Sequence, residues 1–186
     1  MEDSLILDLF WNRSESAIQE TAKKYGRYCH AIANNILRNN EDAEECVNDT
    51  YLTVWGIIPP QRPGIFRAFL GKITRNLSLN KYREQRMKKR GGGEVDLLLS
   101  ELEECIPSGG TTETEHDAKE IIEIINSCLM SLDIDSRNVF VRRYWYAEPV
   151  KGIAVRYQMS ESKVKSMLLR TRGKLKQYLE KREVII

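Results

Sequence analysis

The sequence lacks long apolar runs: none of its 186 residues belongs to a stretch of 18 consecutive apolar residues, so we expect no membrane-spanning helix. The amino terminus has acidic residues where a signal peptide has basic ones, which predicts a cytoplasmic protein. The chain has four widely spaced cysteines, which are Cys29, Cys46, Cys105 and Cys128. No two of them form a C-x-x-C pair, and there are only two histidines, so we expect reduced thiols and no metal site.

Patterns typical of an enzyme are also scarce. Cys29 and His30 are adjacent, but no other pairing of a cysteine with a histidine suggests a nucleophile and its base. The glycines at 91–93 follow an expected helix rather than a strand, which indicates a helix stop and not a phosphate-binding loop. We therefore expect no catalytic residues, no cofactor and no enzymatic activity.

What the sequence does have is a strong segregation of charge, hidden by a net charge of only +2. Residues 62–90 contain 10 Lys/Arg and 1 Asp/Glu, and residues 137–186 contain 13 and 4. Between these basic blocks, residues 91–123 contain 1 Lys/Arg and 10 Asp/Glu. This pattern predicts two polyanion-binding surfaces joined by a segment that avoids the polyanion.

Helical periodicity is common and strand signals are weak, so we expect an all-α fold of two small domains joined by a flexible acidic linker. The expected domains are residues 1–90 and 117–186, and the linker is 91–116, where 95–99 could form a short helical contact. In the first domain we expect helices near 14–37, 40–55 and 65–88. In the second we expect helices from 117 onward, at 135–145, at 150–157 and from the cap Ser160 to about 179, with the last two forming a helix-turn-helix within a four-helix domain.

The last helix is the strongest functional signal. Its apolar residues recur at a spacing of three and four and predict one buried stripe: Val164, Met167, Leu168, Leu175 and Leu179. The opposite surface is mostly cationic: Lys163, Lys165, Ser166, Arg170, Arg172 and Lys174. A rigid cationic helix beside a second, crossing helix fits the major groove of DNA.

The basic block at 62–90 has the composition of a single-strand-binding surface. Its candidate phosphate ligands are Arg67, Lys72, Arg75, Lys81 and Arg83. Asn76 and Asn80 lie one helical turn apart, so their amides share a face and could pair with base edges. The alternative is that both asparagines are ordinary surface residues.

With these residues in view, the chain resembles the extracytoplasmic-function group of bacterial RNA polymerase sigma factors, over roughly 15–88 and 117–182. The first domain contributes DAEECVNDTYLTVW at 42–55 and FRAFLGKITRNLSLNKYR at 66–83. The second contributes RNVFVRRYWY at 137–146, Ile153-Ala154 and residues 160–172. Their order and spacing, with an acidic linker between them, are more specific than the helix-turn-helix alone.

The resemblance implies a first domain that binds core RNA polymerase and melts the minus-ten element, and a second that reads the minus-thirty-five element. It assigns polymerase binding, through the coiled-coil of the β′ subunit, to an acidic surface: Asp42, Glu45, Asn48 and Asp49. It assigns a pocket for a flipped base to the loop 57–64. It also implies contact with the β flap and regulation by an anti-sigma factor.

In the second domain the resemblance implies that four residues face bases and flanking phosphates: Lys165, Ser166, Leu169 and Arg170. Phosphate contacts are expected from four more: Arg142, Arg143, Lys163 and Arg172. One departure is Gly152, because the family commonly has an acidic residue just before the Ile-Ala pair. The competing hypothesis is a conventional helix-turn-helix repressor or activator that binds duplex DNA on its own, usually as a dimer.

Overall fold

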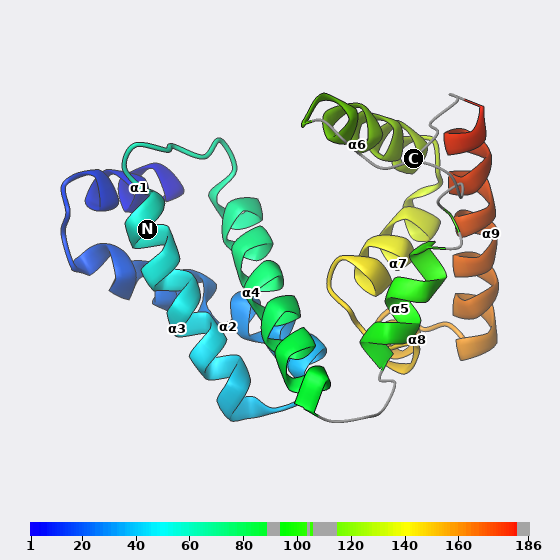
Figure 1. Cartoon of the computed structure of the whole chain (residues 1–186), viewed down its shortest axis with the longest axis horizontal. Coiled ribbons are helices and arrows are strands. Elements are labelled where there is room, and N and C mark those ends of the chain that lie inside the picture. Colours follow the sequence, from blue (N-terminus) through cyan, green and yellow to red (C-terminus); the bar gives the residue numbers. More distant parts are fainter. Residues whose placement is uncertain (89–93, 104, 106–114, 182–186) are drawn as a thin grey trace. The chain divides into compact units, whose positions relative to one another are not determined.

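The computed structural model describes residues 1–88, 94–103, 105 and 115–181. All regular elements in these ranges are α-helices, which confirms the all-α fold class. They divide into two units, one made of α1–α4 and the other of α5–α9 (Figure 1). Within the described ranges, no helix is both long and apolar enough to cross a membrane.

The first unit consists of α1 (Asp3–Trp11), α2 (Ser16–Leu37), α3 (Asn40–Ile57) and α4 (Phe66–Lys88). The three longer helices pack against one another, as Figure 1 shows. The helices expected near 14–37, 40–55 and 65–88 correspond to α2, α3 and α4, so three-to-four periodicity was enough to find them.

Helix α1 was not predicted, because apolar residues surround it with no clear stripe. It buries Ile6, Leu7 and Phe10 against the other helices, and the Phe10 ring lies 6.0 Å from the Phe66 ring. The Tyr25 hydroxyl donates a hydrogen bond of 2.6 Å to Asp3, the first residue of α1. A short helix of this kind is stabilised by tertiary packing rather than by its own propensity.

The interface between α3 and α4 is a seam of small polar side chains. The Thr50 hydroxyl lies 3.1 Å from that of Thr74, and Cys46 Sγ lies 3.4 Å from the Ser78 hydroxyl. Each of the three hydroxyls also donates to a carbonyl one turn earlier in its own helix. Because these buried groups are hydrogen-bonded, they allow close approach of the helices without a desolvation penalty.

This seam corrects the predicted core face of α4. We expected α4 to bury Phe66, Phe69, Leu70, Ile73 and Leu77. Phe66 and Leu70 are buried, but Phe69, Ile73 and Leu77 are only partly buried. The contact face is rotated toward Thr74 and Ser78, which an apolar pattern does not reveal.

The second unit consists of α5 (Glu94–Glu103), α6 (Glu115–Met130), α7 (Ile134–Tyr144), α8 (Val150–Arg156) and α9 (Glu161–Glu180). Helices α6, α7 and α8 all pack on α9. The α9 side chains that make this contact are apolar or small: Val164, Leu168, Thr171, Leu175 and Leu179. The predicted stripe is therefore the buried one, except that Met167 is only partly buried and Thr171 joins it.

Helix α5 lies inside the range that we expected to be a linker. Val95 and Leu98 are buried, and so is Cys105 after the helix. The spacing of three between the buried leucine and valine places both on one face of the helix. The short helical contact considered for 95–99 is thus a helix of ten residues that belongs to the second unit.

The four cysteines are all free and buried. Burial raises the pKa of the Cys29, Cys46 and Cys128 thiols above its ordinary value, so these thiols stay protonated near neutral pH. Among the residues that the structure describes, no group of three or more His, Cys, Asp or Glu side chains could hold a metal ion.

Caps fix where the key helices begin. Asn39 accepts from the Asp42 amide and caps α3. Ser160 accepts from the Lys163 amide at 3.2 Å and caps α9, as expected. We predict that Ser160→Ala lowers the free energy of unfolding of the second unit by about 1 kcal/mol in urea denaturation. Ser162→Ala, an exposed position in the first turn of the same helix, is the control and should have a much smaller effect. Equal losses in both variants would contradict a capping role.

Candidate nucleic-acid interface

The α8–α9 pair forms a helix-turn-helix. In the turn, Gln158 adopts a left-handed conformation with φ of 52°, and the Met159 amide donates to the Ala154 carbonyl at 2.9 Å. Ile153 and Ala154 of α8 are buried, as is Val164 of α9. The crossing of the two helices is therefore fixed by packing, and α9 presents its other side to solvent.

The exposed side of α9 carries the residues predicted to contact bases. Lys163, Lys165, Ser166, Leu169 and Arg170 are all exposed, and Leu169 is 64% exposed although it is apolar. A lone exposed leucine among cations and a serine is suited to contact with a thymine methyl group. We call these five residues the α9 surface. They are five of the eight residues predicted for the minus-thirty-five contact.

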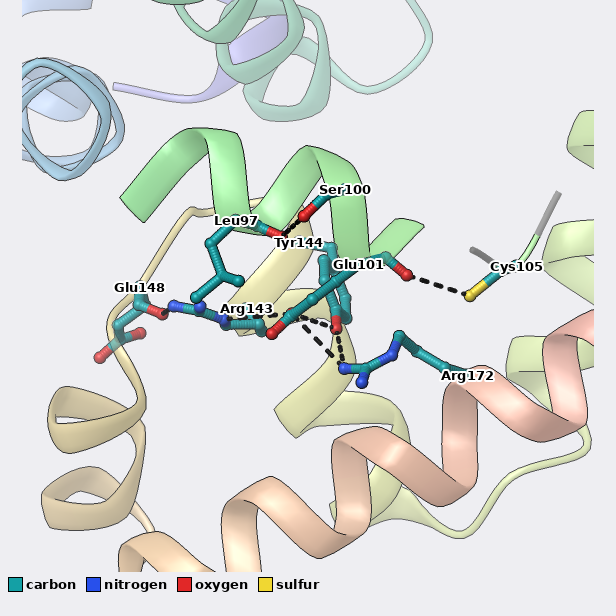
Figure 2. Close-up of polar contacts among 8 residues, drawn as sticks. All are labelled: Leu97, Ser100, Glu101, Cys105, Arg143, Tyr144, Glu148 and Arg172. Atoms are coloured by element: carbon teal, nitrogen blue, oxygen red, sulfur yellow. Dashed lines mark hydrogen bonds and ion pairs between the residues drawn. The ribbon is translucent and has the colours of Figure 1, made fainter. Parts of the chain in front are cut away.

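The other three predicted residues are placed differently. Arg143 is only 2% exposed, and the Arg172 side chain is only 16% exposed. Arg172 Nη1 lies 3.4 Å from Glu101 Oε2 of α5, and Arg143 Nε lies 3.9 Å from the same oxygen. Figure 2 shows that Arg143 Nη1 is turned to the Glu148 carbonyl instead. In this conformation both side chains are mostly buried, so neither belongs to the exposed surface beside α9. Their partner Glu101 lies within residues 91–116, which we expected to be a flexible linker.

Arg142 is half-buried. Its Nη1 lies 3.6 Å from Glu148 Oε2, and its guanidinium lies 4.8 Å from the centre of the Tyr146 ring. A guanidinium held against an aromatic ring keeps its charge and its outward donors. Arg142 therefore stays compatible with a phosphate contact beside the α9 surface.

In the first unit, one face of α4 presents the predicted single-strand ligands. Lys72, Asn76, Asn80 and Arg83 are all exposed. Positions 72, 76 and 80 are spaced by four residues and so line one side of the helix. We call these four residues the α4 surface. It combines two cations with two amides, the groups needed for phosphates and for base edges respectively.

Two further predicted residues of α4 lie at the margin of this surface. Arg67 is exposed, and its guanidinium lies 4.6 Å from the centre of the Tyr28 ring. Arg75 is partly buried, and burial, followed by the nearby charge of Arg83, lowers its pKa. Arg75 remains cationic at neutral pH, because an arginine pKa starts far above neutral.

Lys81 differs from the prediction. Its Nζ lies 2.9 Å from Asp42 Oδ1 and 2.6 Å from Glu45 Oε2, so it bridges α4 to α3. The predicted DNA ligand is thus paired with two of the residues predicted to bind polymerase. Asp42 also accepts a hydrogen bond from Gln85 at 3.0 Å. Lys81 and Asp42 therefore serve the α3–α4 contact in this structure.

The remaining part of the acidic surface on α3 is open. Glu45, Asn48 and Asp49 are exposed, and beside them Leu52 is 65% exposed. On the other side of Asn48 lies an open groove of about 490 Å³ between α2 and α3, bordered by Val47 and Tyr51 among others. This face therefore offers an apolar side chain beside charged and amide groups, a combination that protein interfaces also use.

Comparison with known families assigns the two units to two different regions of one protein family. Residues 21–87 match the family model of sigma-70 region 2, and residues 122–175 match that of sigma-70 region 4. The two matches lie in separate units and together span most of the chain. The chain belongs to the sigma-70 family. The family resemblance predicted from the sequence is thereby confirmed.

A probable RNA polymerase sigma factor, RfaY, of Xanthomonas campestris pv. campestris is 25% identical to the chain over 154 residues. The match covers 82% of this chain and 38% of that protein, so the chain spans well under half the length of this sigma-70 relative. A solved structure of CnrH in complex with the cytosolic domain of CnrY aligns with 96% of the chain and 97% of CnrH, with 20% identity and a TM-score of 0.44.

Residue 152 in sigma-70 region 4 is Gly, where the family commonly has an acidic residue, and a nearby glutamate lies against it. A Cβ atom at this position would lie 3.4 Å from both Cγ and Oε1 of Glu148. The Glu148 side chain thus lies against the first turn of α8, where it accepts a hydrogen bond from Arg156 at 3.0 Å. This turn keeps an acidic group although residue 152 itself has none.

Sequence reasoning missed Leu52 and Glu101. Leu52 could have been noticed as an apolar residue out of phase with the buried stripe of α3. Glu101 had no such signal, because one acid among many in residues 91–123 is unremarkable in composition. Its contacts with Arg143 and Arg172 are long-range and appear only in the folded unit.

Two lysines of α4, Lys72 and Lys81, provide a matched test of the α4 surface. We predict that Lys72→Ala weakens binding of a single-stranded oligonucleotide and lowers the slope of log affinity against log salt by about 0.7, the loss of one phosphate contact. Lys81→Ala removes the same charge but should change the slope much less, because Lys81 is paired with Asp42 and Glu45. Fluorescence anisotropy titrations at several salt concentrations measure both. A larger slope change for Lys81→Ala would contradict the assignment.

Proposed function

We propose that the chain is a sigma factor of the extracytoplasmic-function type, a dissociable subunit that directs core RNA polymerase to promoters. In this proposal the second unit binds the minus-thirty-five duplex through the α9 surface. The first unit binds and opens the minus-ten element through the α4 surface and the loop 57–64. Both roles are non-catalytic and belong to the cytoplasm, where transcription takes place.

One observation carries this proposal: two exposed cationic surfaces lie on two separate helical units, and each unit matches a different sigma-70 region. The α9 surface suits duplex readout, because the major groove admits a helix. The α4 surface suits unpaired bases, because its two amides can form hydrogen bonds with base edges freed from the duplex. A protein that both reads a duplex and holds a single strand fits promoter opening.

The exposed part of the acidic α3 face supports polymerase binding. Glu45, Asn48 and Asp49 share one face of α3 with the exposed Leu52, so the surface offers both charge and an apolar contact. Interfaces commonly combine an apolar centre with charges that set orientation. We propose the β′ coiled-coil as the partner here, with the β flap as the partner of the second unit and an anti-sigma factor as the regulator.

A conventional repressor or activator fits the molecule less well. Such a protein would use the first unit for a ligand or for dimerisation. Instead, the first unit exposes Lys72, Asn76, Asn80 and Arg83 on one helix face. Its match to sigma-70 region 2 also favours the sigma-factor hypothesis over a regulator that acts alone.

The direct test is transcription in vitro with core RNA polymerase, the purified full-length chain and genomic DNA, followed by sequencing of transcript 5′ ends. We expect a set of discrete start sites that appear only when the chain is added and that share upstream sequence. Core polymerase that does not bind the chain, or that starts at the same places without it, would refute the proposal.

Arg170 offers a test of the α9 surface. We predict that Arg170→Ala costs about 1–3 kcal/mol of discrimination between a responsive promoter and a scrambled minus-thirty-five element, because it removes a bidentate contact to a base. Binding to core polymerase should be unchanged. Lys176→Ala, an exposed cation six residues further along α9, is the control and should leave discrimination intact. If Arg170→Ala keeps full discrimination in filter binding by holoenzyme, the assignment is wrong.

A further inference from the structure

Helix α5 places one carboxylate among cationic side chains of α7 and α9. Glu101 Oε2 lies 3.4 Å from Arg172 Nη1 and 3.9 Å from Arg143 Nε. The Tyr144 hydroxyl donates to the same oxygen at 2.8 Å and accepts from Arg172 Nη1 at 2.8 Å. Figure 2 shows Tyr144 and Arg172 directed at Glu101, and Arg143 passing beside it toward the Glu148 carbonyl. We call these four residues the Glu101 cluster.

The hydroxyl in this cluster remains a hydrogen-bond donor throughout the ordinary pH range. Burial, and then the hydrogen bond to Glu101, raise the pKa of Tyr144 well above its ordinary value. Tyr144 therefore links the carboxylate to Arg172 as a neutral bridge. The carboxylate accepts a hydrogen bond from this hydroxyl and lies 3.4 Å from Arg172 Nη1 and 3.9 Å from Arg143 Nε. Guanidinium groups bind phosphate as well as carboxylate.

The cluster borders the surface proposed to bind DNA. Arg172 follows Lys165 by seven residues, or two turns, so the two cations lie on the same side of α9. Arg143 directly follows Arg142, which stays partly exposed beside the turn into α8. Docked α5 therefore withdraws two cations from the edge of this surface and leaves the α9 surface itself open.

The attachment of α5 is modest. Its buried apolar side chains in the described part are Val95 and Leu98, whereas Leu97 is 54% exposed and Ser100 is exposed. Leu99 and Leu102 are partly buried, and Glu101 adds charge-assisted contacts to this apolar attachment. A charge-assisted contact of this kind weakens as salt rises or as another polyanion competes for the same cations.

We propose that α5 is an intramolecular competitor of duplex DNA, in which the Glu101 carboxylate occupies Arg143 and Arg172 until DNA phosphates displace it. This inference rests on the proposed DNA-binding role of the second unit. When α5 leaves, both guanidinium groups are free to bind the sugar-phosphate backbone beside the α9 surface. The free chain therefore binds duplex weakly because part of its cationic surface is already neutralised.

The test compares Glu101→Gln with Glu103→Gln in the full-length chain. Both substitutions remove one negative charge from α5, but Glu103 is exposed. The probe is a fluorescent duplex of two helical turns and arbitrary sequence, because phosphate contacts do not depend on sequence. We expect Glu101→Gln to bind at least about threefold more tightly than wild type, since it raises the fraction of chains with α5 undocked. Its salt dependence should be steeper, and Glu103→Gln should stay close to wild type.

Tyr144→Phe is a second variant, which weakens the cluster without changing charge. It should shift affinity in the same direction as Glu101→Gln but by less, and circular dichroism checks that each variant is folded. The duplex affinity of Tyr144→Phe decides the outcome if Glu101→Gln does not fold. If Glu101 merely stabilises the unit, the folded variants will bind duplex equally or more weakly than wild type, and the proposal is overturned.

The failure of this inference can be told apart from the failure of the proposed function by transcription with the same preparations. Promoter-specific transcription with no gain in duplex affinity for Glu101→Gln would overturn the competitor role alone. A gain in affinity without any promoter-specific transcription would overturn the polymerase role alone. Absence of duplex binding by Glu101→Gln at low salt would also overturn the competitor role.

Discussion

The buried guanidinium of Arg143 is the constraint around which the second unit is arranged. A guanidinium that is 2% exposed needs hydrogen-bond acceptors inside the protein. The Glu148 carbonyl accepts from it at 3.4 Å, at the turn into α8, and the Glu101 carboxylate approaches it from α5. Tyr144 and Arg172 then connect the same carboxylate to α9. One buried cation thus ties together α5, α7, α9 and the start of the helix-turn-helix.

Both units divide their cations in the same way, into those held by acids and those presented to solvent. In the first unit, Lys81 is paired with Asp42 and Glu45, while Lys72 and Arg83 remain exposed on the α4 surface. In the second, Glu101 holds Arg143 and Arg172, while Lys165 and Arg170 remain exposed. The basic blocks of the sequence therefore overstate the charge that is available to a nucleic acid. Which cations are available is decided by tertiary contacts.

This division explains how far the sequence could predict the site. The α9 surface follows from local periodicity, because burial of Val164 and Leu168 forces Lys165 and Leu169 outward. The same periodicity places Asn76 and Asn80 on one exposed face of α4. Pairings such as Lys81 with Asp42, or Arg143 with Glu101, join residues about 40 positions apart, and no local pattern encodes them. The acidic character of residues 91–123 indicated a segment that avoids polyanions, but not that it contains a helix bound to the second unit's own cations.

The measurement that tests this view most directly is amide hydrogen exchange of α5 in the full-length chain, alone and saturated with duplex DNA. Displacement of Glu101 by phosphates should speed exchange of the α5 amides, while amides in the buried stripe of α9 exchange more slowly or unchanged. If α5 becomes more protected when duplex binds, Glu101 supports the DNA-binding surface instead of competing with DNA, and the proposed exchange of one anion for another is wrong.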